Sequence, residues 1–202
     1  MPKKLIAALL LVCSISGFAE EIEEVPTTEK SDLYFGVDIF KSKLSYEFEN
    51  TTFNTTNDFD TNSKGFRLKF GTVSENNWRV QGSFSVENMD DNVFSINDTD
   101  GNLYEIGVDV IKAFEVTPNF APFVLVGLNR GWMSVSGYNV STIDSYAIKA
   151  GAGILYSISE TIELTAGVDF KFRVWSEIEF AGQKIQPTDT SVTPYVGLNV
   201  HF

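Results

Sequence analysis

The side chains of this chain that could do chemistry are mostly acids and bases, and they lie at alternating positions within apolar segments. In IELTAGVDFKFRV, residues 162–174, Glu163 and Asp169 share one side of the alternation with Lys171 and Arg173. Six acids and six bases have this setting: Asp38, Arg67, Lys69, Arg79, Glu87, Glu105, Asp109, Lys149, Glu163, Asp169, Lys171 and Arg173. Because an unpaired buried charge costs several kcal/mol, the equal numbers predict an enclosed face on which these charges pair.

Catalysis would need a nucleophile or a proton-transfer group placed in a site. His201 is the only histidine, and it is the penultimate residue of the chain. In the membrane barrel that the strand pattern predicts, this position is next to the periplasmic end of the last strand, so a serine–histidine mechanism at the outer rim is excluded. We interpret His201 as a lumen or interface residue. Acid pairs could act as general acid and base, but their mixing with bases inside strands favours a structural role. The sequence therefore predicts no enzyme activity, no catalytic residue and no cofactor.

The segment NDTDGN, residues 97–102, is a weak candidate for metal binding, with Asp98 and Asp100 before a glycine turn. A calcium loop would also need an oxygen ligand at position 96 and a glutamate at position 107, where the chain has Ile96 and Gly107. The specific motif is therefore incomplete. The loop could bind divalent cations weakly, for instance as bridges to lipopolysaccharide phosphates; the alternative is a solvated hairpin turn.

The elements that position these side chains have a period of two. In WRVQGSFSVEN, for example, Trp78, Val80 and Phe84 alternate with Arg79 and Glu87. The same rule predicts eight strands, near residues 32–42, 64–73, 78–88, 102–113, 120–132, 144–156, 162–174 and 191–202. Short turns at 74–77, 115–119 and 157–161 alternate with long polar segments near 48–63, 89–101, 133–143 and 176–190. This asymmetry predicts an all-β, antiparallel up-and-down barrel that spans a membrane, with short periplasmic turns and long extracellular loops.

The orientation of the two strand faces distinguishes a membrane barrel from a soluble one. A lipocalin-like barrel lines its interior with apolar side chains, whereas a membrane barrel presents them to lipid. The balanced charged face favours charges inside, because the chain as a whole is acidic, with a net charge of −12 that becomes −14 without Lys3 and Lys4. Trp78, Trp132 and Trp175 at predicted strand ends fit the two lipid–water boundaries. Eight strands leave an interior just wide enough for side chains, which predicts no wide channel.

The N-terminus has the features of an export signal. In residues 1–19, MPKKLIAALLLVCSISGFA, two lysines precede an apolar run, and small residues flank one variable position before the predicted cleavage after Ala19. Serines interrupt the run well before the length of about 20 residues that a transmembrane helix needs. Cys13, the only cysteine, is removed with this segment. Residues 20–31 are predicted to form an acidic periplasmic tail, and residues 32–202 the barrel.

The C-terminal segment TPYVGLNVHF, residues 193–202, alternates to its last residue. Together with the export signal and the eight alternating strands, it resembles the small outer-membrane barrels of the OmpX and OmpA transmembrane-domain type over essentially the whole mature chain. The resemblance implies an integral protein of the outer membrane of a Gram-negative bacterium, reached after Sec-type export. It also implies that Tyr195, Val200 and Phe202 belong to a sorting signal read by the barrel assembly machinery, with periplasmic chaperones as further partners.

The sequence thus predicts a structural or surface-interaction role, such as adhesion or envelope integrity, carried by the extracellular loops. The expected partners are outer-membrane lipid, lipopolysaccharide and a surface ligand that the sequence does not identify. The acidic charge argues against nucleic acid. Two alternatives stay open: a narrow porin-like channel for small solutes or ions, and a soluble periplasmic lipocalin-like barrel with an apolar ligand pocket.

Overall fold

A computed structural model of the protein describes residues 32–50, 55–74, 76–89, 101–135, 140–180 and 183–202. Within these ranges the regular elements are β-strands, and no helix is long and apolar enough to cross a membrane. The predicted export signal at 1–19 and the acidic tail at 20–31 lie outside the described residues. The same holds for Asp98 and Asp100 of the candidate cation loop.

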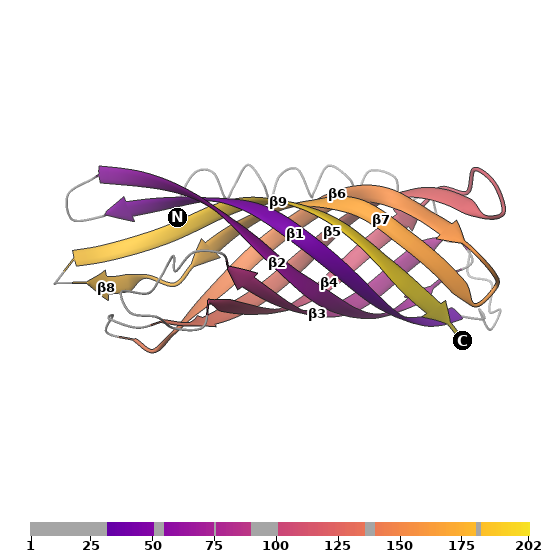
Figure 1. Ribbon diagram of the computed structural model, residues 1–202, viewed down its shortest axis with the longest axis horizontal. Helices are drawn as coiled ribbons and strands as arrows, with labels where there is room; N and C mark the ends of the chain where they lie inside the picture. Colours follow the sequence, from indigo (N-terminus) through magenta and orange to yellow (C-terminus); the bar gives the residue numbers. More distant parts are fainter. Residues whose placement is uncertain (1–31, 51–54, 75, 90–100, 136–139, 181–182) are drawn as a thin grey trace, which may run out of the picture.

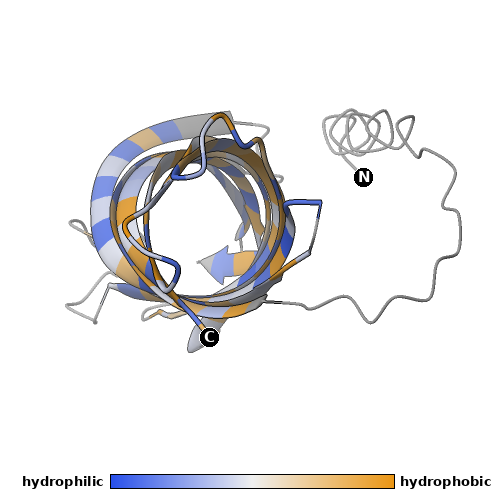
Figure 2. Ribbon diagram, turned by 90° about the vertical axis from the view of Figure 1, so that its right-hand side faces the viewer, coloured by the Kyte–Doolittle hydropathy of each residue, from blue (hydrophilic) through white to orange (hydrophobic). Residues whose placement is uncertain are grey.

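The described strands follow one another around a single closed sheet. They are β1 (Asp32–Asn50), β2 (Thr55–Val73), β3 (Trp78–Met89), β4 (Asn102–Ala113), β5 (Phe120–Ser134), β6 (Thr142–Ser157), β7 (Ile162–Trp175), β8 (Ile178–Phe180) and β9 (Gln183–His201). Sequence neighbours from β1 to β7 pair antiparallel, and β9 pairs with both β7 and β1, so eight strands close into the ring seen end-on in Figure 2. The short β8 pairs with the start of β9. The predicted eight-stranded antiparallel barrel is confirmed.

The period of two decides which side chains face the lumen. On β3, Arg79 and Glu87 are buried inside the barrel, whereas Val80 and Phe84 are 48% and 37% exposed on its outer surface. Large apolar side chains such as Phe170, 57% exposed, cover the outside of the other strands as well. A large exposed apolar surface marks contact with a membrane or a partner, and its combination with a polar interior is the arrangement of a membrane barrel. The soluble lipocalin-like alternative requires the opposite arrangement and does not fit.

Two of the predicted long loops are wrong in extent. Residues 48–63 were expected to be loop, but β1 continues to Asn50 and β2 begins at Thr55; within the expected loop 176–190, β9 already begins at Gln183. Figure 1 shows these strand ends extending past β3 and β4 at the left of the view. One face of these strand ends is buried, but its side chains, such as Thr61, Ser63 and Asp189, are polar like those of the outer face. The hydropathy alternation therefore disappears, although threonine and aromatic residues still favour extended backbone.

The other end of the barrel is closed by short connections after β2, β4 and β6. In the first of these, the Ser74 N–H donates to the Trp78 carbonyl at 2.8 Å and the Asn77 N–H donates to the Ser74 carbonyl at 3.0 Å. Asn77 has φ 58°, a left-handed conformation that asparagine adopts more readily than most residues. We call this the short-turn end and the opposite one the long-loop end.

Candidate functional site: the charge-filled lumen

The twelve charged residues singled out in the sequence all point into the barrel. None of them is more than 8% exposed, and they come from all eight strands of the ring except β5 and β9. A seventh acid, Asp189 of β9, joins them at 1% exposure, so seven acids and six bases of the described residues share the lumen. Asp189 was missed because it lies in a segment that was expected to be loop. The charged side chains thus lie in a low-dielectric interior, where each charge needs a partner of opposite sign.

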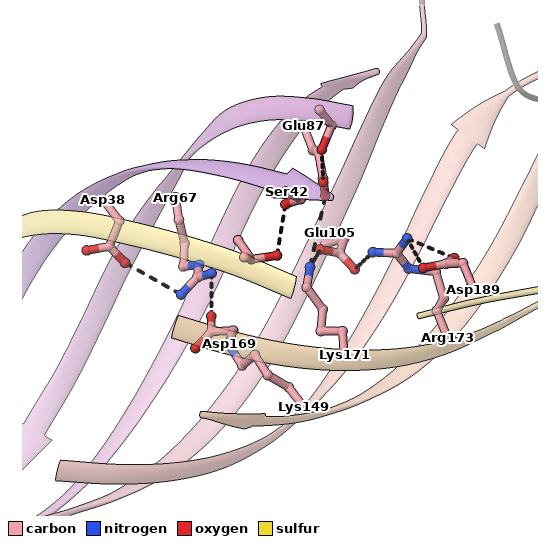
Figure 3. Close-up of polar contacts among 12 residues, drawn as sticks. Asp38, Ser42, Arg67, Glu87, Glu105, Lys149, Asp169, Lys171, Arg173 and Asp189 are labelled. Atoms are coloured by element: carbon pink, nitrogen blue, oxygen red, sulfur yellow. Dashed lines mark hydrogen bonds and ion pairs between the residues drawn. The ribbon is translucent and has the colours of Figure 1, made fainter. Parts of the chain in front are cut away.

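Arg67 of β2 bridges two carboxylates near the middle of the lumen (Figure 3). Its Nη2 lies 2.8 Å from Asp169 Oδ2 and its Nη1 lies 3.5 Å from Asp38 Oδ2. Lys69 Nζ lies 2.6 Å from Asp38 Oδ1 and gives that carboxylate a second cation. The Arg67 guanidinium also sits 5.1 Å from the ring centroid of Tyr195. These contacts tie β1, β2, β7 and β9 together across the interior.

Asp109 of β4 is the centre of a second group in the lumen. Lys149 Nζ lies 2.7 Å from Asp109 Oδ1, and Gln81 Nε2 donates to Asp109 Oδ2 at 2.8 Å. The Tyr34 hydroxyl in turn donates to Gln81 Oε1 at 2.8 Å. Lys149 is only 3% exposed, so its charge is held by a carboxylate rather than by solvent. The chain of contacts joins four strands, β1, β3, β4 and β6.

Toward the long-loop end, Glu105 accepts from two cations of β7. Lys171 Nζ lies 2.6 Å from Glu105 Oε2, and Arg173 Nη2 lies 2.9 Å from Glu105 Oε1. Arg173 Nη1 also lies 3.1 Å from Asp189 Oδ2, which accepts a further hydrogen bond of 2.7 Å from Trp175 Nε1. Figure 3 shows Arg173 placed between the two carboxylates. Arg173 is fully buried, so this group forms a continuous polar network out of contact with bulk solvent.

At the short-turn end, Arg79 and Glu163 form a bidentate ion pair between β3 and β7. The two Nη–Oε distances are 2.7 and 2.8 Å. Asn199 Nδ2 donates to Glu163 Oε1 at 2.8 Å, and His201 Nε2 lies 3.6 Å from the same oxygen. The His201 ring is 5.4 Å from that of Tyr34. His201 therefore lies at the short-turn mouth of the lumen, beside an ion pair.

Two apolar clusters share the interior with the charged groups. One lies toward the long-loop end and consists of Leu44, Tyr46, Met89, Leu103, Met133, Val135, Ile143, Trp175 and Ile178. The other consists of Phe40, Ile111, Ala113, Phe123, Leu125, Leu155 and Tyr195. The expectation that Trp175 lies at a lipid–water boundary is wrong, because its side chain is 1% exposed and faces the lumen. Between the charged groups a cavity of about 20 Å³ remains, which is room for about one water molecule. At this level the lumen is closed by side chains.

Three lumen glycines make room for three lumen carboxylates. The carboxylates were predicted from the sequence, but the glycines were not. In the strand registers Asp38 is opposite Gly197, Asp109 is opposite Gly127 and Asp169 is opposite Gly151. A Cβ atom on Gly151 would lie 2.6 Å from Asp169 Oδ1, and the other two glycines are closer still to their carboxylates. One sequence signal could have identified these glycines. It is a glycine on the polar face of one strand when the neighbouring strand carries an aspartate at the opposite position of its own polar face.

The outer face of the extended strands carries a hollow of about 670 Å³ at the long-loop end. Glu47, Asp58, Asp60 and the hydroxyl residues Ser45 and Thr190 are among its lining. The Ser45 hydroxyl donates to Asp60 Oδ1 at 2.6 Å. Within the described residues no group of metal-ligating side chains is arranged to hold an ion. The hollow is an open, polar and acidic surface above the barrel wall.

The three residues of the expected sorting signal lie on different sides of β9. Tyr195 is 6% exposed and faces the lumen, whereas Val200 is 38% exposed on the outer surface. Phe202 is 70% exposed, its N–H donates to the Leu33 carbonyl at 2.9 Å, and its ring lies 6.5 Å from that of Phe70. Their expected role precedes folding, because the assembly machinery would read the segment before it pairs with β1.

A family model described as an outer membrane protein beta-barrel domain matches residues 5–202. A comparison with curated proteins found no match. Among solved structures, the chain is similar to Neisserial surface protein A, with a TM-score of 0.52 and 16% identity over 82% of this chain and 97% of that one. It is also similar to OprG from Pseudomonas aeruginosa, with a TM-score of 0.56 and 12% identity over 89% and 99% of the two chains. The chain is similar to the outer membrane protein AlkL as well, with a TM-score of 0.54 and 10% identity over 91% of this chain and 95% of that one.

Proposed function

The chain belongs to the outer-membrane β-barrel family, and we propose that it has a structural or surface-interaction role in which a closed barrel anchors the long-loop end at the cell surface. The filled lumen carries this proposal. Ion pairs cross the interior at several levels, and the cavity between them measures about 20 Å³. A barrel filled in this way supplies rigidity and anchorage, whereas a channel would need these pairs to separate.

We assign the short-turn end to the periplasm and the long-loop end to the outside, as is usual for barrels of this type. The extended parts of β1, β2 and β9 then stand above the membrane surface and expose the acidic hollow lined by Glu47, Asp58 and Asp60. A polar surface held on a rigid sheet is suited to contact with a partner protein or surface polymer. The role is non-enzymatic, since the lumen acids are matched by bases at ion-pair distance.

Cysteine accessibility tests the orientation. The only native cysteine is Cys13, in the predicted export signal, so one introduced thiol can be labelled without background. An Asp58→Cys variant should react with a membrane-impermeant maleimide on intact cells. Asn76→Cys, at the short-turn end, should react only after the outer membrane is permeabilised. Labelling in the opposite pattern would reject the assignment.

A shortened hairpin tests the role itself. Tyr46 and Phe59 are opposite each other in the β1–β2 register, so residues 47–58 can be replaced by a two-residue Asn-Gly turn. The variant should still migrate differently on gels before and after boiling, because the barrel below is unchanged. Attachment of the cells to surfaces should fall to the level of a deletion strain. Attachment at the level of the native protein would contradict the proposal that the extended sheet is the contact surface.

A further inference from the structure

Three lysines lie together on the outer face of β1 and β2, and we call them the lysine cluster. Lys41 is directly opposite Lys64 in the strand register, and Lys43 lies two residues further along β1, opposite Asn62. All three side chains are exposed. Side chains directly opposite in an antiparallel pair have Cβ atoms about 5 Å apart, and diagonal ones about 7 to 8 Å apart. Flexible lysine side chains at these separations can bring their ammonium groups to a common ligand.

On β1 and β2 the lysine cluster marks the upper limit of the apolar outer surface. One step nearer the barrel middle, the outward-facing residues on the same strands are Ile39 and Phe66, 63% and 42% exposed. At the level of Lys64 the neighbouring strands carry Asn88 and Asn102, whose side chains are joined by a hydrogen bond of 3.0 Å. The ammonium groups are therefore at the boundary between lipid tails and headgroups.

The positive charge of the cluster is only partly balanced. Lys43 Nζ lies 3.8 Å from Asp60 Oδ2, and both side chains are more than 60% exposed. Among the residues that the structure describes, no carboxylate is within ion-pair distance of Lys41 or Lys64. By contrast, Arg130 on the outer face of β5 is paired with Asp144 at 3.2 Å. Because like charges directly opposite each other are destabilising, the Lys41–Lys64 pair favours an anion between its two ammonium groups.

An apolar groove begins beside Lys41, at the seam where β1 meets β9. The pairing register includes Phe40 with Tyr195 and resumes only at Lys43 with Val192. Pro194 lies in this interruption, and it has no N–H to donate to β1. A shallow, open hollow of about 360 Å³ lies here, lined by Ile39, Phe40, Lys41, Pro194, Tyr195 and Val196. Its outward-facing lining is apolar except for Lys41.

We propose that the lysine cluster and this groove bind a phosphorylated, acylated glycolipid of the outer leaflet, the chemical class of the lipid A part of lipopolysaccharide. One phosphate lies between Lys41 and Lys64, where it offsets their repulsion. One acyl chain lies along the groove over Ile39 and Val196. The adjoining apolar groove favours a lipid over a free anion. The inference rests on the orientation given under the proposed function, because only a lipid of the outer leaflet meets the long-loop end.

Lipid titration of the purified full-length mature barrel in zwitterionic micelles tests the site. Native mass spectrometry gives the apparent Kd for diphosphorylated lipid A, with a chelator present so that no divalent cation bridges acids to phosphate. The Lys41→Gln/Lys64→Gln double variant should bind about 30-fold more weakly, the expected effect of removing two ammonium groups at an anionic headgroup. The matched control Arg130→Gln removes a charge that already has a partner and should bind as the native protein does. Dephosphorylated lipid A should bind the native protein as weakly as the diphosphorylated lipid binds the double variant.

Equal binding by the native protein and the double variant would overturn the proposal, as would equal binding of the lipids with and without phosphates. Complete competition by inorganic phosphate would also overturn it, by identifying a site for a free anion. Gel mobility before and after boiling verifies that each variant is folded, and Lys64→Gln alone serves if the double variant does not fold. Lipid binding in micelles does not depend on how the barrel is oriented in the cell. A failure of the lipid titration can therefore be distinguished from a failure of the orientation tested by cysteine labelling.

Discussion

Replacement of Arg67 by methionine tests whether the lumen charges hold the barrel together as pairs. Arg67 is 4% exposed and is the cation nearest to Asp169, at 2.8 Å, whereas Asp38 keeps Lys69 at 2.6 Å when Arg67 is removed. Methionine keeps most of the side-chain volume beside Tyr195. The change therefore leaves one fully buried carboxylate, that of Asp169, without its cation.

The expected cost follows from this geometry. Removing one partner of a buried ion pair destabilises a protein by about 3 to 5 kcal/mol, because the remaining charge is left without compensation. The Arg67→Met/Asp169→Asn double variant removes both charges and keeps the shape of the carboxylate, so its free energy of unfolding should lie within about 2 kcal/mol of the native value. The double variant should thus be more stable than the single variant.

Urea unfolding of the barrel in lipid vesicles measures these free energies, with the gel mobility of unboiled samples as the readout of folding. The Asp169→Asn single variant completes the double-mutant cycle and isolates the coupling between the two side chains. If Arg67→Met lowered the free energy of unfolding by less than about 1 kcal/mol, the value typical of an exposed ion pair, the reasoning would be refuted. A double variant no more stable than Arg67→Met would refute it as well.

Three further predictions concern the glycines, the lipid-facing surface and the C-terminus. Gly127→Ala should destabilise the barrel by about 1 to 3 kcal/mol, because its Cβ would overlap the Asp109 carboxylate, whereas Gly82→Ala meets only ordinary contact and should be neutral in the same urea assay. Val126→Arg, facing lipid near the middle of β5, should cost about 2 to 4 kcal/mol in vesicles; a neutral effect would place that face away from lipid. Deletion of Phe202 should lower the amount of assembled barrel in cells while purified protein still refolds in detergent, and an unchanged amount would count against the sorting role.

The sequence was sufficient to predict the number of strands in the closed ring, although not the short β8, and to predict which of their side chains face the lumen. Within the membrane one face meets lipid and the other meets a charged interior, so the hydropathy period is strong in β3 and β7. In β5 the sequence alone does not define which residues face the lumen, because Phe123 and Leu125 belong to an interior apolar cluster while Val124 and Val126 face outward. A strand that is apolar on both faces carries no alternation to read.

The partner of each lumen charge could not be predicted. Arg67 and Asp169 are separated by 102 positions in the sequence, and Arg79 and Glu163 by 84. Which of them meet depends on the stagger of the strands when the ring closes, a property of the whole barrel rather than of any segment. The lumen glycines could not be predicted for the same reason, because their role depends on which residue of the neighbouring strand lies opposite them. The extended strand ends were missed because their buried side chains, such as Thr61 and Asp189, are polar and give no hydropathy alternation.

The closed lumen is the centre of this account, and conductance across a planar bilayer tests it most directly. The purified mature protein is first checked for folding by its change in gel mobility on boiling and is then reconstituted. Ion pairs across the interior and a cavity of about 20 Å³ predict a bilayer without discrete conductance steps. Reproducible steps, altered in size by substitution of Arg79 or Asp169, would contradict the account and establish a narrow channel through the lumen.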